Sequence, residues 1–115
     1  MDRLRIIGCT LALVGVLSAT ATSARADERY GFCMAAMGDN ATRQWKNFTT
    51  GVFTTPWPVT QSLESRYVAY LVPKYNVYES SVDCPTYPAK ADADAALAQR
   101  KSGQNLIATD WTPAP

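Results

Sequence analysis

The amino-acid sequence predicts an α+β fold: an N-terminal β-hairpin followed by α-β-α-β, with one mixed four-stranded sheet, two helices packed on it and one disulfide. Segments of strand length, rich in aromatic and β-branched residues, alternate with two segments of helical periodicity. All three Trp, all six Tyr and all three Phe lie after residue 29, so this part has the large side chains that a packed core needs. The order of the elements favours a mixed sheet that both helices cover.

The N-terminal segment has the pattern of a secretory signal peptide at 1–26. Two arginines form a positive start, residues 6–17 are strongly apolar, and the small-residue sequence Ala24-Arg25-Ala26 follows. We therefore expect cleavage after Ala26, which leaves a single small domain at 27–115 in the periplasm or outside the cell. A membrane-spanning helix needs about 20 apolar residues. Residues 18–26 are too polar to complete one, so we expect no stable membrane anchor after cleavage.

The expected mature chain is close to electrically neutral. The full chain has 11 basic and 10 acidic residues, and residues 1–26 hold three of the former and one of the latter, which leaves eight basic and nine acidic. Nucleic-acid binding depends on basic groups that neutralise phosphates, and an anionic membrane surface attracts similar basic clusters. We therefore expect neither of these partners. We expect a monomer that binds a protein or glycan of the envelope.

The first two predicted strands, 29–38 and 48–55, form a hairpin. The apolar residues of the first segment are divided between its two faces, with Tyr30, Phe32 and Met34 on one and Cys33 and Met37 on the other. A turn cluster at 38–40 follows. The second segment is β-branched and aromatic, and Gly51 within it suggests a bulge or a close approach of backbone.

Two helices are predicted, at 61–71 and at 89–103. In the first, Thr60 is a suitable N-cap, the apolar spacing is helical, and Pro73 predicts the end. Its apolar face consists of Leu63, Tyr67, Tyr70 and Leu71. The second is rich in alanine, the best helix former, and Gly103 provides a C-terminal stop.

Two further strands are predicted, at 75–85 and at 105–111. The first of them places Tyr78, Val82 and Cys84 on one face and Glu79 and Asp83 on the other. The second places Ile107 and Trp111 on one face.

The chain lacks the residues on which most enzyme sites depend. It contains no histidine, which excludes Ser-His and Cys-His catalysis. No Gly-rich phosphate loop is present, and two mature cysteines are too few for a structural zinc site. The best carboxylate pair is Asp92 and Asp94, but residues two apart on a helix do not face each other. We therefore expect no catalytic residues, no metal and no cofactor; the alternative is a small carboxylate-dependent hydrolase.

Two tryptophans are candidates for a partner surface. Trp57 lies in a loop between Pro56 and Pro58, and Trp45 lies in a polar stretch. Tryptophan is common at contact sites for sugars and proteins. The alternative is that both side chains close the edges of a small core.

Cys33 and Cys84 are predicted to form a disulfide. Cleavage of the leader removes Cys9, so that one possible pairing remains in a compartment where disulfides persist. Such a bond ties the first predicted strand to the third. The alternative is two buried thiols.

The segment ADADAALAQRKSGQNLIA at 91–108 resembles part of the sporulation-related repeat (SPOR) domain: an Ala-rich helix, a stop at Gly103 and a following strand. The resemblance implies a small sheet with two helices on one face, and binding of peptidoglycan glycan strands in the bacterial envelope. The chain departs from that pattern where Arg100 and Lys101 replace an apolar helix residue, and in its opening hairpin. The resemblance therefore assigns no binding residues here.

These observations together predict an exported, non-enzymatic binding or interaction domain of the bacterial cell envelope or periplasm. The first alternative is a peptidoglycan glycan-binding module. The second is the small carboxylate-dependent hydrolase.

Overall fold

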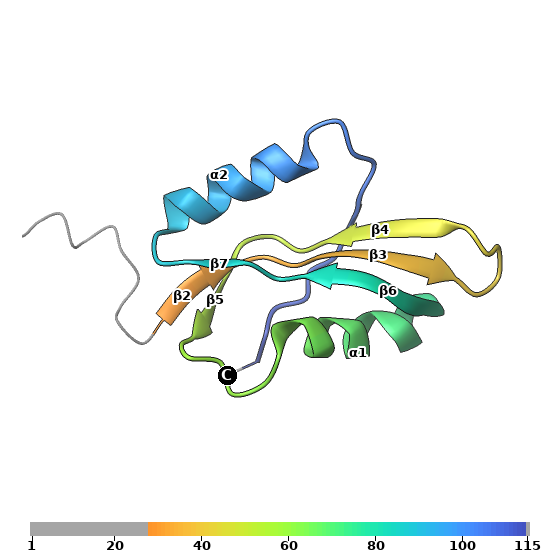
Figure 1. Cartoon of the computed structure of the whole chain (residues 1–115), viewed down its shortest axis with the longest axis horizontal. Coiled ribbons are helices and arrows are strands. Elements are labelled where there is room, and N and C mark those ends of the chain that lie inside the picture. Colours follow the sequence, from red (N-terminus) through yellow and green to blue (C-terminus); the bar gives the residue numbers. More distant parts are fainter. Residues whose placement is uncertain (1–27, 115) are drawn as a thin grey trace, which may run out of the picture.

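A computed structural model describes residues 28–114, which form two helices and two β-sheets (Figure 1). The expected signal peptide lies outside the described residues. Among residues 28–114, no helix is long and apolar enough to cross a membrane. In chain order the elements are β2 (Glu28–Gly31), β3 (Met34–Asp39), β4 (Trp45–Thr49), β5 (Phe53–Pro56), α1 (Leu63–Tyr75), β6 (Val77–Asp83), β7 (Thr86–Tyr87), α2 (Lys90–Lys101) and β8 (Ile107–Ala108).

The strands are divided between two sheets. The four-stranded sheet has the order β6-β3-β4-β8 and is mixed, because β8 runs parallel to β4 while the other pairs are antiparallel. The three-stranded sheet has the order β5-β2-β7 and is antiparallel. The predicted α+β class, the two helices and the disulfide are confirmed. The prediction of a single sheet is wrong, because each of the first two predicted strands is divided between the two sheets, and the chain after the third forms β7 in the other sheet.

The chain passes between the two sheets three times, from β2 to β3, from β4 to β5 and from β6 to β7, and the strand pairing is interrupted beside Cys33 each time. The backbone N–H of Cys33 donates to the hydroxyl of Thr50 at 2.9 Å, where a side chain takes part in place of the regular ladder. On the other side of the same strand stands Pro85, which has no N–H and cannot continue the ladder as a donor. Backbone polar groups at the break thus form local hydrogen bonds, and these take the place of the regular pairing between strands.

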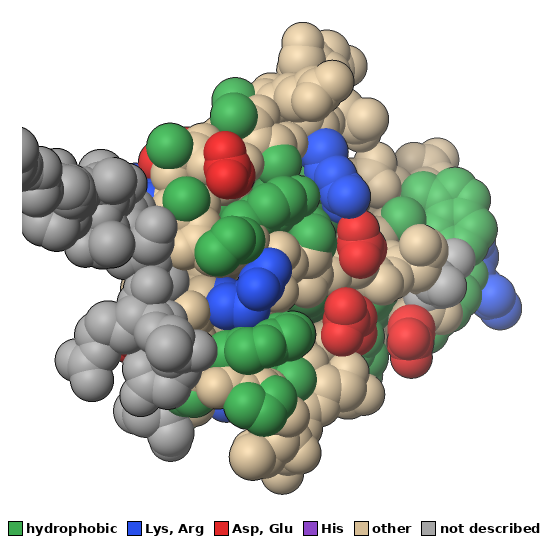
Figure 2. All heavy atoms as spheres, turned by 60° about the vertical axis from the view of Figure 1, so that its left-hand side comes forward, with side chains coloured by type: hydrophobic (Ala, Val, Ile, Leu, Met, Phe, Trp, Pro, Cys, Tyr) green, Lys and Arg blue, Asp and Glu red, His purple; other side chains and the backbone are tan. Residues whose placement is uncertain are grey.

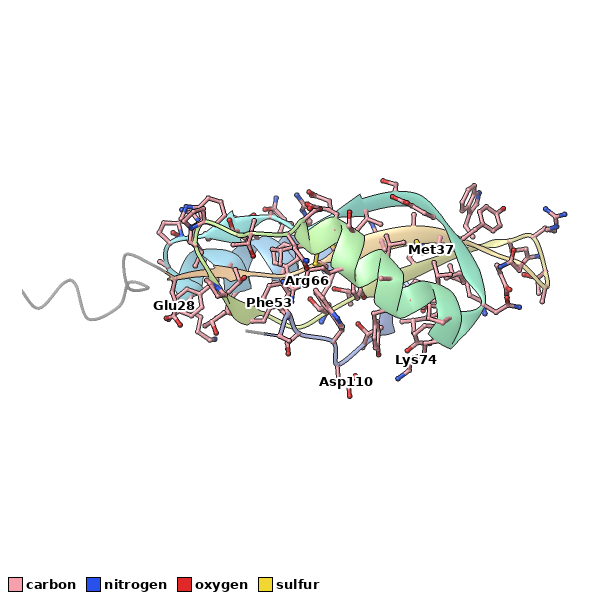
Figure 3. All side chains as sticks on the ribbon, turned by 90° about the horizontal axis from the view of Figure 1, so that it is seen from below. Glu28, Met37, Phe53, Arg66, Lys74 and Asp110 are labelled. Atoms are coloured by element: carbon pink, nitrogen blue, oxygen red, sulfur yellow. A yellow bond between two sulfur atoms is a disulfide. The ribbon has the colours of Figure 1, made fainter. Side chains whose placement is uncertain are left out.

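Helix α1 covers one face of the four-stranded sheet (Figure 3). Leu63, Tyr67 and Leu71 form its buried face, as the spacing predicts. They join Met37 and Phe48 in the main core, in which each of these five side chains is at most 5% exposed. This burial fixes which side of β3 faces α1.

The ends of α1 differ from the prediction. The cap is Ser62, whose hydroxyl accepts from the Ser65 N–H at 3.2 Å, and Thr60 lies outside the helix. Pro73 lies within the last turn, where a missing hydrogen bond has a small effect because the helix ends at Tyr75. The following Asn76 adopts the left-handed conformation (φ 54°) that commonly terminates helices.

Helix α2 lies on the opposite side of the strands from α1 (Figure 1). It packs on β7 and β2 of the three-stranded sheet, where Ala93 and Leu97 are buried. Phe32, which is fully buried, stacks on Tyr87 at 6.2 Å between ring centroids. Because α2 contacts mainly the three-stranded sheet, the prediction that both helices cover one sheet is also wrong.

The last predicted strand is reduced to two residues. Ile107 is 38% exposed at the edge of the sheet. Trp111 lies beyond β8 and packs on Tyr67 and Phe53, at 5.1 and 5.9 Å between ring centroids. The expected shared strand face of Ile107 and Trp111 therefore does not exist, since only Trp111 reaches the main core.

Candidate ligand-binding groove

The four-stranded sheet has an outer face, opposite α1, that is only partly covered. Directly opposite residues of neighbouring strands point to the same side of a sheet. The pairing therefore places three cross-strand rows on the outer face: Trp45, Gly38 and Tyr78; Asn47, Ala36 and Ser81; Thr49, Met34 and Asp83. Small residues occupy the middle of the first two rows.

A bulge in β6 puts Tyr78 on this face. Ala36 pairs with Ser81 and Met37 pairs with Glu79, which leaves one residue of β6 without a partner. The extra residue shifts the alternation of the preceding part of the strand. Tyr78 therefore lies on the side opposite Val82 and Cys84, and the prediction that these three residues share a face is wrong.

Trp45 and Tyr78 form an aromatic pair at one end of the outer face. Their ring centroids are 6.4 Å apart, and the residues are 62% and 39% exposed. The Tyr78 ring lies directly over Gly38, so a Cβ at residue 38 would clash with it. The glycine is thus the reason why the tyrosine ring can lie flat across the strand beside the tryptophan.

The turn between β3 and β4 fixes the position of Trp45. The carboxylate of Asp39 accepts hydrogen bonds from the Ala41 N–H at 3.0 Å and the Thr42 hydroxyl at 3.2 Å, and its ion pair with Lys46 spans 3.1 Å. These contacts hold the pKa of the Asp39 carboxyl below its usual value, and the hydrogen bond from the Ala41 N–H has the largest effect. A charged side chain thus organises the turn from within.

The C-terminal end of α2 lies beside the outer face, and between them is an open groove of about 410 Å³. This volume lies in the range of small-ligand pockets, about 300–1,000 Å³. The hydrogen-bonding side chains that line the groove are mainly uncharged amides and hydroxyls: Asn47 and Ser81 from the sheet, and Gln99, Ser102 and Gln104 from α2 and the loop after it. We call this hollow the outer groove.

One ion pair crosses the outer groove. The Arg100 guanidinium donates to Asp83 at 2.7 Å, and its Cζ lies 5.6 Å from the centre of the Phe32 ring. No other charged residue of the described chain lines the groove. Because the two charges cancel, the lining favours a ligand with no net charge.

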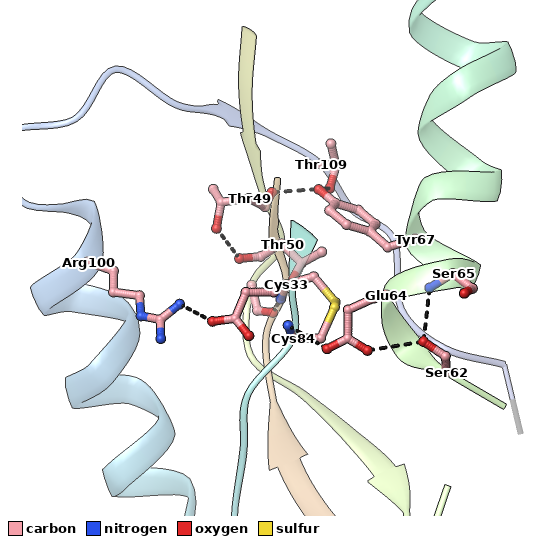
Figure 4. Close-up of a disulfide and its surroundings, with 12 residues drawn as sticks. Cys33, Thr49, Thr50, Ser62, Glu64, Ser65, Tyr67, Cys84, Arg100 and Thr109 are labelled. Carbon is pink, nitrogen blue, oxygen red and sulfur yellow. Dashed lines mark hydrogen bonds and ion pairs between the residues drawn. A yellow bond between two sulfur atoms is a disulfide. The ribbon is translucent and has the colours of Figure 1, made fainter. Parts of the chain in front are cut away.

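The Cys33–Cys84 disulfide lies at the break between the sheets, outside this lining (Figure 4). The two residues stand opposite each other, with Cα atoms 4.1 Å apart, and are 0% and 6% exposed. The Glu64 carboxylate accepts from the Cys84 N–H at 3.1 Å and thereby links α1 to the same point. The bond links the β2–β3 connection to the β6–β7 connection, between the two sheets, and presents no reactive thiol to the groove.

The structure separates the two predicted partner-surface residues. Trp45 lies at the β3–β4 turn, and Trp57 follows β5 at the other end of the molecule (Figure 1). The sequence did not identify the groove residues Asn47 and Ser81, or Tyr78 on the same face, because their shared face depends on strand pairing and on the bulge. The carboxylate pair at residues 92 and 94 forms no site: both residues are exposed on α2, and Asp94 pairs with Lys90 at 2.8 Å.

Trp111 is expected to contribute more to stability than Trp57. Trp111→Ala removes packing against the buried Tyr67 and should lower the free energy of unfolding by about 3 kcal/mol. Trp57 is 41% exposed and stacks on Arg29, a contact of about 1 kcal/mol at an exposed site. Urea denaturation of both variants measures the difference. Equal losses would place Trp57 in the core.

Comparisons of the chain with models of known protein families, with curated proteins and with solved structures find no match. The geometry of the outer groove therefore carries the functional argument.

Proposed function

We propose that the mature chain is an exported, non-enzymatic binding module of the bacterial envelope or periplasm, and that it holds its ligand in the outer groove. The observation that carries the proposal is the face of the four-stranded sheet opposite α1. It is hollowed and lined by hydrogen-bonding side chains, and two exposed aromatic rings, those of Trp45 and Tyr78, lie farther along the same face. A concave surface with a few convergent polar groups is typical of binding sites.

The ionisable groups of the groove support binding rather than catalysis. A carboxylate-dependent hydrolase needs a carboxyl group that is available to the substrate. The Asp83 carboxylate is instead paired with Arg100. Within residues 28–114, no group of three or more His, Cys, Asp or Glu side chains could hold a metal ion.

The second candidate, a glycan-binding module of the cell wall, is favoured by the aromatic pair. Rings such as those of Trp45 and Tyr78 stack on the apolar faces of sugar rings. The amides of Asn47 and Gln99 and the hydroxyl of Ser81 can pair with sugar hydroxyls and acetamido groups. The absence of net charge in the lining also fits an uncharged stretch of polysaccharide.

Sedimentation with purified peptidoglycan tests the glycan-binding candidate and the assignment of the outer groove. We expect the exported protein to sediment with the polymer, and Trp45→Ala and Asn47→Ala to weaken this binding by about tenfold, as for a contact hot spot. Val72→Ala is the control, because it removes an exposed apolar side chain from α1, on the opposite face of the sheet, and should bind as the unchanged protein does.

Two outcomes would contradict these expectations. Protein that stays in the supernatant excludes the cell-wall glycan. Protein that sediments equally well with Trp45→Ala and with Asn47→Ala binds elsewhere, and this result contradicts the assignment of the outer groove.

A further inference from the structure

A second cluster lies on the three-stranded sheet, away from the outer groove, and is centred on Arg29 of β2. The Arg29 Cζ lies 4.8 Å from the centre of the Trp57 ring. The guanidinium also donates twice to Thr86 of β7, from Nε to the hydroxyl at 3.0 Å and from Nη2 to the backbone carbonyl at 3.1 Å. Figure 2 shows basic and hydrophobic side chains next to one another at this end of the molecule.

These contacts hold the guanidinium in one orientation. Nε and Nη2 form one edge of the planar group, and Thr86 occupies that edge. A guanidinium has five N–H donors, and within residues 28–114 the second edge, formed by Nη1 and the remaining hydrogen of Nη2, donates no hydrogen bond. That edge has the fork geometry that matches the two oxygens of a carboxylate.

Within residues 28–114, the ion pairs involve other basic residues, and no carboxylate lies within ion-pair distance of Arg29. Arg29 is partly buried, and the Trp57 ring shields one of its faces from water. A cation that is fixed and partly shielded gains more from an anionic partner than a flexible surface cation does.

Trp57 adds an apolar contact beside the cation. It is 41% exposed, and its neighbours Pro56 and Pro58, which are also exposed, restrict the backbone. Arginine and tryptophan are among the residues most enriched at energetic centres of protein interfaces. A rigid pair of this kind loses little conformational entropy when a partner binds.

We propose that Arg29 and Trp57 form a second binding site, which receives a peptide carboxylate, with the apolar side chain next to that carboxylate resting on the Trp57 ring. Charge complementarity selects the occupant. One cation matches one carboxylate, whereas a phosphate dianion is better matched by several donors and more positive charge. The site is independent of the outer groove and of its ligand.

The test is a titration of the exported, disulfide-bonded protein followed by ¹⁵N NMR of the Arg29 Nε–H and the Trp57 indole N–H. The probe is N-acetylleucine, and the matched neutral probe is N-acetylleucinamide. We expect saturable shifts of both resonances with the carboxylate and binding of the amide at least about tenfold weaker, as for hydrogen bonds to a charged group.

Variants separate recognition from a structural role. Arg29→Lys keeps the charge but removes the fork, and should weaken binding of N-acetylleucine by about tenfold while the fold is retained. Arg100→Lys changes an arginine of the outer groove and should leave this binding unchanged. Asp27→Asn removes the carboxyl side chain two positions before Arg29 in the sequence, so it tests whether the chain's own acid competes for the site.

Three results would overturn the proposal. The first is the absence of saturable shifts in both the unchanged protein and Asp27→Asn. The second is equal binding of the carboxylate and the amide. The third is tighter binding of inorganic phosphate than of N-acetylleucine. Failure of the peptidoglycan experiment has no bearing on this titration, because the two sites share no residue.

Discussion

Replacing Cys33 and Cys84 together by alanine is expected to lower the free energy of unfolding by about 4 kcal/mol, the value that the chain-entropy model gives for a loop of this length. The two cysteines are 51 positions apart, so the bond removes many conformations from the unfolded chain. Small domains have total stabilities of about 5–15 kcal/mol. The bond therefore accounts for a large share of the stability of this domain.

The position of the bond adds a local consequence. The ladders of the two sheets are interrupted on both sides of β2 and β3 at the level of Cys33, and the disulfide crosses one of these interruptions. Helix α2 packs on the three-stranded sheet, whereas the floor of the outer groove belongs to the four-stranded sheet. Loss of the bond should therefore allow α2 to move relative to the four-stranded sheet, and these two elements form the sides of the groove.

Urea denaturation of the double variant, and of the unchanged protein with and without reductant, measures the effect. The reduced protein and the double variant should lose similar amounts of stability. A loss below about 1 kcal/mol in both would show that the hydrogen-bonded contacts at the break, rather than the bond, hold the sheets together.

The helices could be predicted because their signals are local. The spacing of Leu63, Tyr67 and Leu71 identifies the buried face of α1 without knowledge of its partner. Gly103 marks the end of α2 and adopts a positive φ of 72° just after it. The cap was assigned to the wrong residue, because Thr60 and Ser62 both carry a hydroxyl that can accept from the first turn, and the helix begins after Ser62.

The division into two sheets depends on non-local pairing. Gly51 and Pro85 are visible irregularities in the sequence, but each alone indicates only a local bulge or a loop. They mark a boundary between the sheets because they lie on either side of the β2–β3 connection, where the Phe32 N–H donates to the Pro85 carbonyl and the Cys33 carbonyl accepts from Thr50, the residue before Gly51. The apolar periodicity of one strand does not tell which residues of another strand it pairs with.

The candidate site shows the same limit. Trp45 could be singled out as a large aromatic residue in a polar stretch. Strict alternation predicts that Tyr78 shares a face with Val82, and the bulge in β6 puts it on the opposite face. Arg29 carried no sequence signal, because its role depends on Thr86 and Trp57, which are far away in the sequence.

Tyr67 is expected to be one of the largest single contributors to the core. Its side chain is fully buried and packs between α1 and the C-terminal segment, with Trp111 at 5.1 Å between ring centroids. Tyr67→Ala should lower the free energy of unfolding by about 3–5 kcal/mol, as for other buried aromatic residues. Tyr67→Phe keeps the ring and should cost about 1 kcal/mol, the net value of one hydrogen bond.

The hydroxyl of Tyr67 belongs to a short chain of hydrogen bonds. It lies 2.8 Å from the Thr109 hydroxyl, which donates in turn to the backbone carbonyl of Thr49 at 3.1 Å. With that proton of Thr109 engaged, Tyr67 acts as the donor. This series of hydrogen bonds therefore requires a protonated phenol, and it connects α1 to β4 and to the segment after β8.

Because the phenol must be protonated, the free energy of unfolding is expected to fall at alkaline pH. Burial raises the pKa of Tyr67 to about 12, from an ordinary value near 10, because it penalises the phenolate. Below pH 10 the phenol is neutral in both the folded and the unfolded chain, and its contribution is complete. As the pH rises from about 10 to 12, the unfolded chain ionises at this residue first, so stability falls.

Urea denaturation between pH 7 and pH 11 distinguishes this ionisation from the general effects of alkali. Tyr67→Phe should be less stable than the unchanged protein at pH 7, and the gap should narrow as the pH exceeds 10, because phenylalanine cannot ionise. Tyr78→Phe, which removes an exposed phenol, is the matched control and should follow the unchanged protein. A gap that stays constant across this range would mean that the folded and unfolded chains release the Tyr67 proton equally easily, which contradicts a buried, proton-donating phenol.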